Sequence, residues 1–367
     1  MFLAFTGTVH SAIAQGVIWS IMTLGVYITF RILDFADLTV DSSFTTGAAV
    51  SAMLVAHGGW NPFLALFGAL AAGMVCGFIT GFLNTKMKIP GILAGILTMT
   101  ALYSINIRIM GDSSMVPLNG VDTADVLVRE VIPGISAANC QLLIGGVVTA
   151  IVIAFLYWFF GTELGCAIRA TGNNPYMVRS LGVHTDNTTM VALVLSNGLV
   201  ALSGGIFAQM QGSASVDMGT GTIVIGLASV IIGEVVLGRH VGFLPRLLCM
   251  VLGSVIYRIV IAVVLFLGLK STDMKLITAI IVAIALFLPT GKRKVQAWND
   301  RRKAMRQPVL VPARLRVACF RWAGEGGWGR GKPRSKGFPQ PVLVPDRAVE
   351  DSIDGSDKDP DEANQKE

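Results

Sequence analysis

The sequence predicts an all-α protein, a polytopic integral membrane helix bundle. Hydrophobic residues make up 53% of the 367 positions, charged residues only 14%, and the mean hydropathy is +0.65. These values are too apolar for a water-soluble domain. The charges are also segregated, because residues 1–291 hold 12 basic and 12 acidic residues whereas 292–367 hold 17 and 11. A membrane domain and a polar tail therefore adjoin near Pro289.

Apolar stretches recur along the first region at the length that a bilayer requires, roughly 20 residues for a helix crossing about 30 Å of hydrocarbon. We expect about nine transmembrane segments, near residues 12–31, 43–57, 62–85, 89–110, 139–160, 188–209, 220–238, 246–268 and 275–290. The second is short for a span and follows three closely spaced carboxylates. It predicts one short or broken helix near residues 34–57.

Two domains are expected, a transmembrane domain over 1–291 and a cytoplasmic tail over 292–367. The tail is basic over 292–336 and acidic over 346–367, and it repeats the motif Gln-Pro-Val-Leu-Val-Pro at 307–312 and 340–345. Such a composition buries too little apolar surface to offset its ordering entropy, so we expect it to be largely disordered. Its basic part either contacts anionic lipid headgroups or is a solvated extension.

The orientation follows from the distribution of Lys and Arg among the short loops. With the N-terminus outside, the inner loops carry ten basic residues and the outer ones carry four: Arg108, Arg129, Lys270 and Lys275. The inner set comprises Arg31, Lys86, Lys88, Arg169, Arg179, Arg239, Arg246 and Lys292–Lys294. The sequence thus predicts a multi-pass membrane protein with the N-terminus outside and the C-terminus cytoplasmic.

Several classes of enzyme are excluded by missing motifs. The chain has no GxxxxGK[ST] phosphate loop, no HExxH zinc site and no GxSxG nucleophile elbow. Its five cysteines are far apart and odd in number, which argues against a disulfide scaffold. We therefore expect no catalytic residue, no metal, no cofactor and no nucleic-acid partner. Any nucleotide hydrolysis must occur in another chain.

The stretch from Asp34 to Ser43 allows two interpretations. Non-helical backbone at membrane depth persists only where it is buried in protein or lines a cavity. A short helix beginning at Asp41 and Ser42 would then aim its free N–H groups at an anionic substrate. Alternatively, these two residues only cap a helix at the inner water interface.

Glycines mark sites of close helix packing. Gly73, Gly77 and Gly81 lie four residues apart and make one flat stripe, and Gly91 and Gly95 repeat the device. Small residues allow membrane helices to approach closely. The stripe is either a seam between mobile helices or ordinary static packing.

The longest inner loop, residues 161–185, has helical periodicity. Leu164, Ala167, Ile168 and Thr171 fall on one face, a Gly-Asn-Asn-Pro turn at 172–175 follows, and a second amphipathic stretch runs over 177–183. This predicts two short helices along the membrane surface. They form either a rigid cytosolic knob or an interfacial reinforcement.

This loop resembles a specific family. Its Arg169-Ala-Thr-Gly-Asn173 sequence before a Gly-Val turn is similar to the cytoplasmic loop of ABC importer permeases of the branched-chain amino acid and ribose permease superfamily. Residues 32–44, 91–111 and 233–238 resemble tryptophan/tyrosine-type permeases within it, and the likeness covers about 12–294. The family usually has Gly where Ser42 stands, and it has nothing like the tail.

The resemblance implies the permease subunit of an importer for an amino-acid-like solute, located in a bacterial inner membrane. The likeness to tryptophan/tyrosine-type permeases implies an aromatic solute. It implies a second permease copy in a homodimer, a cytosolic ABC ATPase, an extracytoplasmic solute-binding protein and surrounding lipid as partners. The expected ATPase-coupling residues are Arg169, Gly172, Asn173 and Leu181. The expected translocation path residues are Asp37, Asp41 and Ser42.

Two alternatives stay open at this stage. A proton- or ion-coupled secondary transporter would use Glu234, Arg258 and the carboxylates of residues 34–41. The depths of Glu234 and Arg258 should differ by about 11 Å, which argues against a direct salt bridge between them. A membrane scaffold without transport activity is the other alternative.

Overall fold

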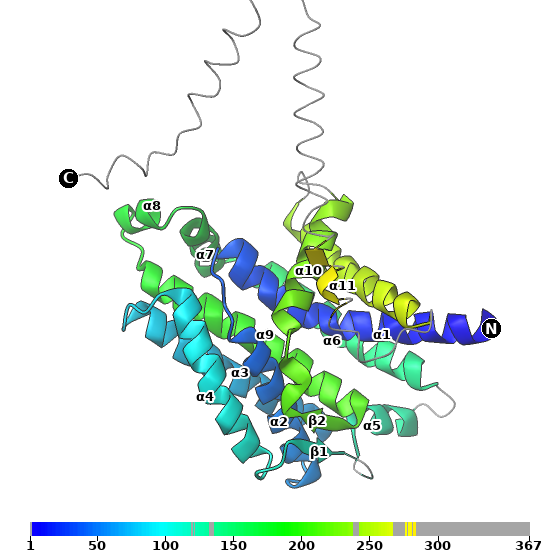
Figure 1. Ribbon diagram of the computed structural model, residues 1–367. Coiled ribbons are helices and arrows are strands. Elements are labelled where there is room, and N and C mark those ends of the chain that lie inside the picture. The colour runs from blue at the N-terminus through cyan, green and yellow to red at the C-terminus, as the bar shows by residue number, and fades with distance from the viewer. Residues whose placement is uncertain are drawn as a thin grey trace, which may run out of the picture. The chain divides into compact units, whose positions relative to one another are not determined.

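The structure is a computed structural model that describes residues 2–118, 120, 122–131, 136–237, 242–266, 276, 278–280 and 282–283. The tail predicted over 292–367 lies outside this part of the chain. The described residues form a helix bundle with one small two-stranded sheet (Figure 1). The long helices are α1 (Phe2–Val26), α3 (Pro62–Thr85), α4 (Gly91–Ile109), α6 (Ala137–Gly161), α9 (Thr185–Gln211) and α11 (Phe243–Phe266).

Shorter elements complete the bundle. A π-helical turn, η1 (Tyr27–Ile32), continues α1, and a 3₁₀ turn, η2 (Val216–Gly219), precedes α10 (Thr222–Leu237). Strands β1 (Met115–Pro117) and β2 (Ser213–Ser215) pair antiparallel, with Met115 opposite Ser215. The remaining helices are α2 (Val40–Ala56), α5 (Ala124–Val131), α7 (Glu163–Asn173) and α8 (Pro175–Ser180).

The number of spans differs from the expected nine. Within the described ranges, seven helices are long and apolar enough to cross a membrane, and α2 is a shorter apolar helix. These eight correspond to the first eight predicted segments. The ninth, 275–290, falls almost wholly outside the described residues, so nine spans are not confirmed.

The predicted short helix near residues 34–57 is confirmed as α2, but it begins at Val40 and not at 43. Residues 33–39 connect it to η1 without helical structure. Asp34 there has a φ of 56°, a left-handed conformation that short polar side chains tolerate. The N-cap of α2 is Thr39, so Asp41 and Ser42 lie in the first turn of this helix.

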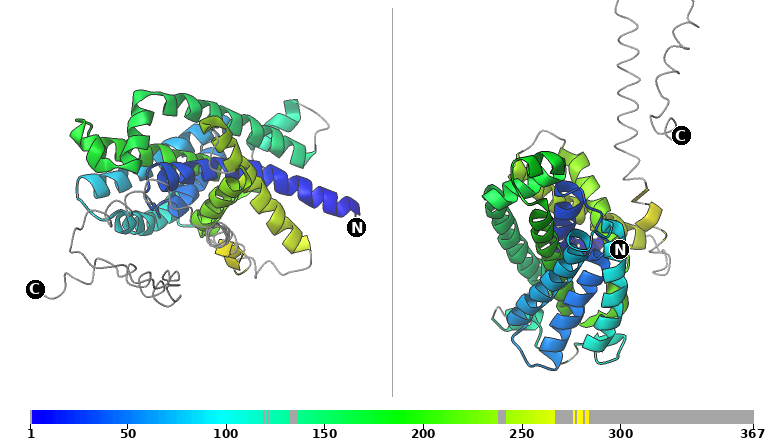
Figure 2. Two further views of the ribbon diagram at one scale, coloured as in Figure 1. Left: turned by 90° about the horizontal axis from the view of Figure 1, so that it is seen from above. Right: turned by 90° about the vertical axis from the view of Figure 1, so that its left-hand side faces the viewer.

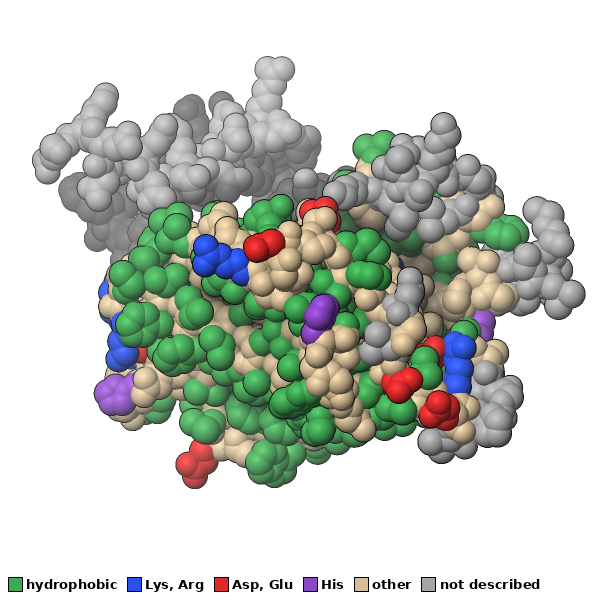
Figure 3. All heavy atoms as spheres, turned by 90° about the horizontal axis from the view of Figure 1, so that it is seen from below, with side chains coloured by type: hydrophobic (Ala, Val, Ile, Leu, Met, Phe, Trp, Pro, Cys, Tyr) green, Lys and Arg blue, Asp and Glu red, His purple; other side chains and the backbone are tan. Residues whose placement is uncertain are grey.

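Helices α1 and α9 form the centre of the bundle. In the most apolar stretch of each, about 78% is buried, against 28% for α4 at the periphery. Figure 2 shows α1 running through the bundle and projecting from it at the N-terminus. On the face shown in Figure 3, hydrophobic side chains are spread over much of the surface, as expected of a protein in contact with lipid.

The predicted glycine stripe on α3 is a close contact with α9. A Cβ added at Gly73 would lie 2.4 Å from the Asn197 carbonyl oxygen, and one at Gly77 would lie 2.4 Å from that of Leu193. Any larger residue would force the two backbones apart. The glycines of α4 pack against a different segment. Gly91 lies against Phe35 and Gly95 against Leu38, both in the segment before α2.

Candidate functional site

Basic residues gather at the end of the bundle where α7 and α8 lie. Helices α7 and α8 occupy this end and β1, β2 and α5 the other (Figure 1). Connectivity and contacts place six basic residues at this basic end: Arg31, Lys86, Lys88, Arg169, Arg179 and Arg246. Among the described residues, Arg108 and Arg129 lie toward the opposite end, at the end of α4 and in α5.

The two short helices predicted in the 161–185 loop are confirmed as α7 and α8. The Thr162 hydroxyl accepts a hydrogen bond from the Gly165 N–H at 3.4 Å and caps α7. Asn174 accepts one from the Met177 N–H at 3.1 Å and caps α8, whose first residue is Pro175. These are standard helix-start signals, so the break between the helices is encoded locally.

The surface of this helix pair that faces away from the bundle exposes large apolar side chains. Tyr176 is 81% exposed, Leu181 69%, Met177 58% and Leu164 56%. We call these four residues the α7–α8 surface. Of the residues predicted to share one face of the first helix, Ile168 and Thr171 are buried, whereas Leu164 is exposed. Grouped apolar exposure at a charged end of the molecule is typical of a protein contact site.

The predicted coupling residues divide between this surface and its support. Leu181 belongs to the α7–α8 surface, and Asn173 is exposed beside it. The Arg169 guanidinium donates to the Phe160 carbonyl oxygen at 2.7 Å and lies 5.4 Å above the Phe243 ring, so it fastens α7 to the ends of α6 and α11. Its observed contacts are thus internal.

Gly172 joins α7 to the end of η1. A Cβ at this position would lie 1.9 Å from the Ile32 carbonyl oxygen, which leaves room for hydrogen only. Because backbone meets backbone here, a displacement of α7 must be accommodated by Ile32 and by the 33–39 segment that follows it.

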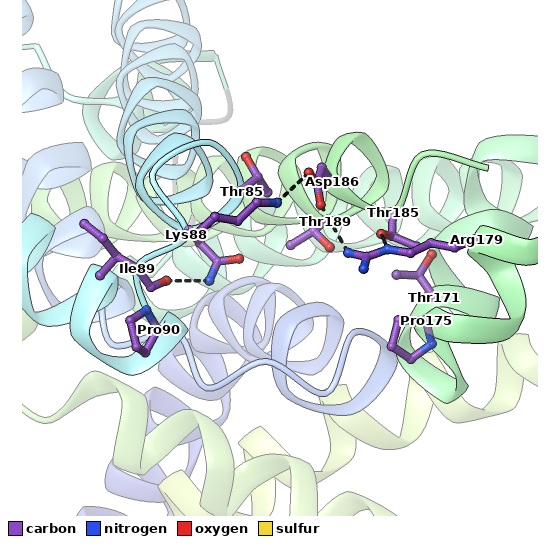
Figure 4. A pocket seen from close by; sticks show the side chains of 11 residues that line it. Thr85, Lys88, Ile89, Pro90, Thr171, Pro175, Arg179, Thr185, Asp186 and Thr189 are labelled. Carbon is purple, nitrogen blue, oxygen red and sulfur yellow. Dashed lines mark hydrogen bonds and ion pairs between the residues drawn. The ribbon is translucent and has the colours of Figure 1, made fainter. Parts of the chain in front are cut away.

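Ion pairs attach α8 to its surroundings. Asp186, in the first turn of α9, accepts from Lys88 at 2.9 Å and lies 3.5 Å from a guanidinium nitrogen of Arg179 (Figure 4). Figure 4 also shows Arg179 reaching the Thr185 hydroxyl, a distance of 2.7 Å. These groups line a cavity of about 330 Å³ between α8, α9 and the α3–α4 loop. The pairs are exposed and therefore weak individually.

A second cavity, of about 470 Å³, lies between η1, α7 and α11. Arg31, Arg169, Asn173 and Arg246 line it. Glu234 of α10 forms a salt bridge with Arg31, with Oε1 2.5 Å from Nε. Glu234 therefore does not pair with Arg258, as the difference in depth predicts.

The three predicted path residues all lie in a buried polar cluster at the N-terminus of α2. Asp37 is 2% exposed, and its carboxylate accepts from the Asn197 amide at 2.7 Å and from the Thr39 N–H at 2.9 Å. Asn197 also accepts from the Ser43 hydroxyl at 2.7 Å. One amide of α9 thereby bridges the segment before α2 and its first turn.

Asp41 caps a different helix from its own. Its Oδ1 accepts from the Thr222 hydroxyl and the Ile223 N–H, both at 2.8 Å, and its Oδ2 accepts from the Gly221 N–H at 3.0 Å. These donors form the start of α10, where a carboxylate is favoured by the free N–H groups and the helix dipole.

Ser42 completes the cluster by donating to the Met99 carbonyl oxygen of α4 at 3.0 Å. We call Asp37, Asp41, Ser42, Ser43 and Asn197 the α2 network. It binds the first turn of α2 to α4, α9 and α10, and each of the three predicted path residues already has a hydrogen-bond partner.

The partners in this network were not predicted from the sequence. Asn197 and Thr222 are uncharged, lie in apolar helices and are separated from Asp37 and Asp41 by 160 and 181 positions. The only signal in the sequence was the presence of uncharged polar residues within the apolar spans.

Among the described residues, no group of three potential metal-ligating His, Cys, Asp or Glu side chains is present.

The family model for the branched-chain amino acid transport system permease component matches residues 8–287. The chain belongs to this family. A tyrosine transport system permease of Clostridioides difficile is 39% identical over 294 residues, covering 78% of this chain and 92% of the relative. A Rickettsia prowazekii protein described as uncharacterized is 32% identical over 286 residues, covering 75% of this chain and 95% of the relative.

Among solved structures, PsaBC from Streptococcus pneumoniae in complex with Fab aligns with 78% of this chain and 95% of that chain, at 14% identity and a TM-score of 0.43. The family match confirms the resemblance found in the sequence. The chain is a transmembrane permease of an ABC transporter, a transport component that is not itself an enzyme.

Proposed function

We propose that this permease imports an amino-acid-like solute with an aromatic side chain, and that a cytosolic ATPase drives it through the α7–α8 surface. The observation that supports this most is the exposure of Tyr176, Met177 and Leu181 on a capped, well-supported helix pair. The tyrosine system relative supports the aromatic solute. The family supports an ATPase and an extracytoplasmic solute-binding protein as partners.

In this proposal the basic end is cytoplasmic. Six basic residues of the described loops and helix ends gather there, in line with the excess of Lys and Arg on the inner side of membrane proteins. The N-terminus of α1 is then outside. A second permease copy and lipid cover the exposed apolar faces of peripheral helices such as α4.

Coupling runs from α7 to the α2 network. Closure of the ATPase dimer moves α7, the contact of Gly172 with Ile32 transfers this movement to residues 33–39, and Asp37 and Asp41 carry it to α9 and α10. The predicted path residues act here by holding helices that move together. Such rearrangement of packed elements is a common form of alternating access.

Reconstitution tests this function directly. The permease, its ATPase and its solute-binding protein in proteoliposomes should accumulate radiolabelled L-tyrosine when ATP is present, and not when a non-hydrolysable ATP analogue replaces it. Uptake driven by an imposed pH gradient without the ATPase would contradict the proposal and favour a proton-coupled carrier. Family membership does not support that alternative.

A further inference from the structure

We propose that Arg258, stacked on Trp19, holds the carboxylate of the transported aromatic amino acid within the membrane. This inference rests on the proposed function and identifies the group that recognises the solute. Arg258 lies in α11, and its guanidinium carbon is 3.8 Å from the centre of the Trp19 ring in α1. The side chain is partly buried.

The pair lies within the span, far from the basic end of the bundle. Arg258 is the sixteenth residue of α11, so it lies about 22 Å from the helix end at Phe243. Trp19 precedes Ile32, the end of η1, by 13 residues, which corresponds to about 20 Å. Both estimates place the pair about 20 Å from the basic end, and therefore inside a hydrocarbon core of about 30 Å.

Contacts between α10 and α11 confirm this depth. A Cβ at Gly233 would lie 2.4 Å from the Cys249 carbonyl oxygen, and one at Gly253 would lie 2.1 Å from that of Ser229. Extending this antiparallel register places Arg258 opposite the first turn of α10, the turn that Asp41 caps. The pair therefore lies next to the α2 network and far from Glu234.

Among the described residues, Arg258 has no counter-ion. In the described part of the chain it forms no salt bridge and no hydrogen bond, and its Nε is enclosed without an acceptor. The indole N–H of Trp19, a residue 4% exposed, is likewise buried without an acceptor. Arginine stays protonated in proteins, and a charge at membrane depth normally pairs or faces a wet cavity. Two neighbouring donors without acceptors thus form a site suited to an anion.

The surroundings favour an anion that carries an aromatic group. Trp19 lies 5.2 Å from Phe44 and 5.4 Å from Phe207 between ring centroids, and Phe44 and Phe207 are 6.0 Å apart. Phe207 and Met218 pack on this cluster but are only half-buried, so they form its open edge. A carboxylate on the planar fork of Arg258 would place an aromatic side chain against this edge.

Transport by variants provides the first test. In the reconstituted complex, Arg258→Gln should lower L-tyrosine uptake at least about tenfold, because a charge-assisted hydrogen bond is lost. Arg258→Lys should retain part of the uptake, because it keeps the charge but not the fork. The amount of assembled complex should not change, and Arg108→Gln, the matched control, should keep normal uptake. Normal uptake in Arg258→Gln, or an equal loss of assembled complex, would overturn the proposal.

Direct protection provides the second test and does not depend on transport. A cysteine is placed at Met218 in a permease with Cys166→Ser and Cys319→Ser, because Cys166 is exposed whereas Cys76, Cys140 and Cys249 are buried. L-tyrosine should slow labelling of this cysteine by a water-soluble thiol reagent. Tyramine lacks the carboxylate and should not slow the labelling. Arg258→Gln should abolish the protection by L-tyrosine. Equal protection by both compounds, or none by L-tyrosine, would overturn the assignment. Absence of ATP-driven uptake by the unmodified complex would instead refute the proposed function.

Discussion

Residues of the α7–α8 surface and of the α2 network were both predicted to be functional, but the first are exposed and the second are buried. The α7–α8 surface leaves Tyr176, Met177 and Leu181 exposed on helices that are held from behind. The α2 network buries Asp37 and Asp41 and satisfies both carboxylates internally. A site that binds a partner keeps its side chains free, whereas a site that transmits movement commits them to neighbouring helices.

This difference predicts that substitutions in the two regions affect different quantities. Replacing residues of the α2 network should lower stability, because buried donors lose their acceptor. Replacing residues of the α7–α8 surface should leave stability almost unchanged, because exposed side chains contribute little to it.

The largest loss of stability is expected for Asp41→Ala. The substitution removes three hydrogen bonds to a carboxylate, each worth roughly 1.5–3 kcal/mol, and leaves the N–H groups at the start of α10 without an acceptor. Thermal unfolding in detergent should show a clear fall in melting temperature. Glu130→Ala, at an exposed position of α5, is the control and should unfold like the unmodified protein. A stable Asp41→Ala variant would remove the distinction between the two regions.

An intermediate effect is expected for Gly172→Ala. The added methyl group would overlap the Ile32 carbonyl oxygen, and such overpacking typically costs about 1–3 kcal/mol. Because this contact also links α7 to residues 33–39, solute-stimulated ATP hydrolysis should fall more than the amount of assembled complex. Gly161→Ala is the matched control, because no atom lies within 4 Å of the added Cβ. Equal behaviour of the two variants would show that the contact transmits nothing.

The smallest effect is expected for Lys88→Ala. Its partner Asp186 retains Arg179, and the Lys88 side chain is 66% exposed, so stability should change by less than about 1 kcal/mol. The difference in melting temperature between the variant and the unmodified protein should shrink from low to high salt, because salt screens exposed pairs. A larger, salt-independent loss would mean that the support of α8 is part of the buried core.

Local patterns predicted the helices well and their contacts poorly. Apolar runs and caps such as Asn174-Pro175 depend on neighbours in sequence, so α7 and α8 were predictable. The start of α2 at Val40 and the capping of α10 by Asp41 depend on helices that are distant in the chain. The family resemblance pointed to the predicted coupling loop, but only the structure separates Leu181, which is exposed, from Gly172, which packs against Ile32.

The most direct test of the account is co-purification of the ATPase with a permease carrying Met177→Asp and Leu181→Asp. Both residues are exposed, so we predict an unchanged melting temperature together with loss of the bound ATPase and of ATP-driven uptake, because charges replace the apolar contact. Met177→Leu with Leu181→Met should bind normally. Retention of the ATPase by the aspartate variant would contradict the central claim that the α7–α8 surface is where the energy of ATP enters this permease.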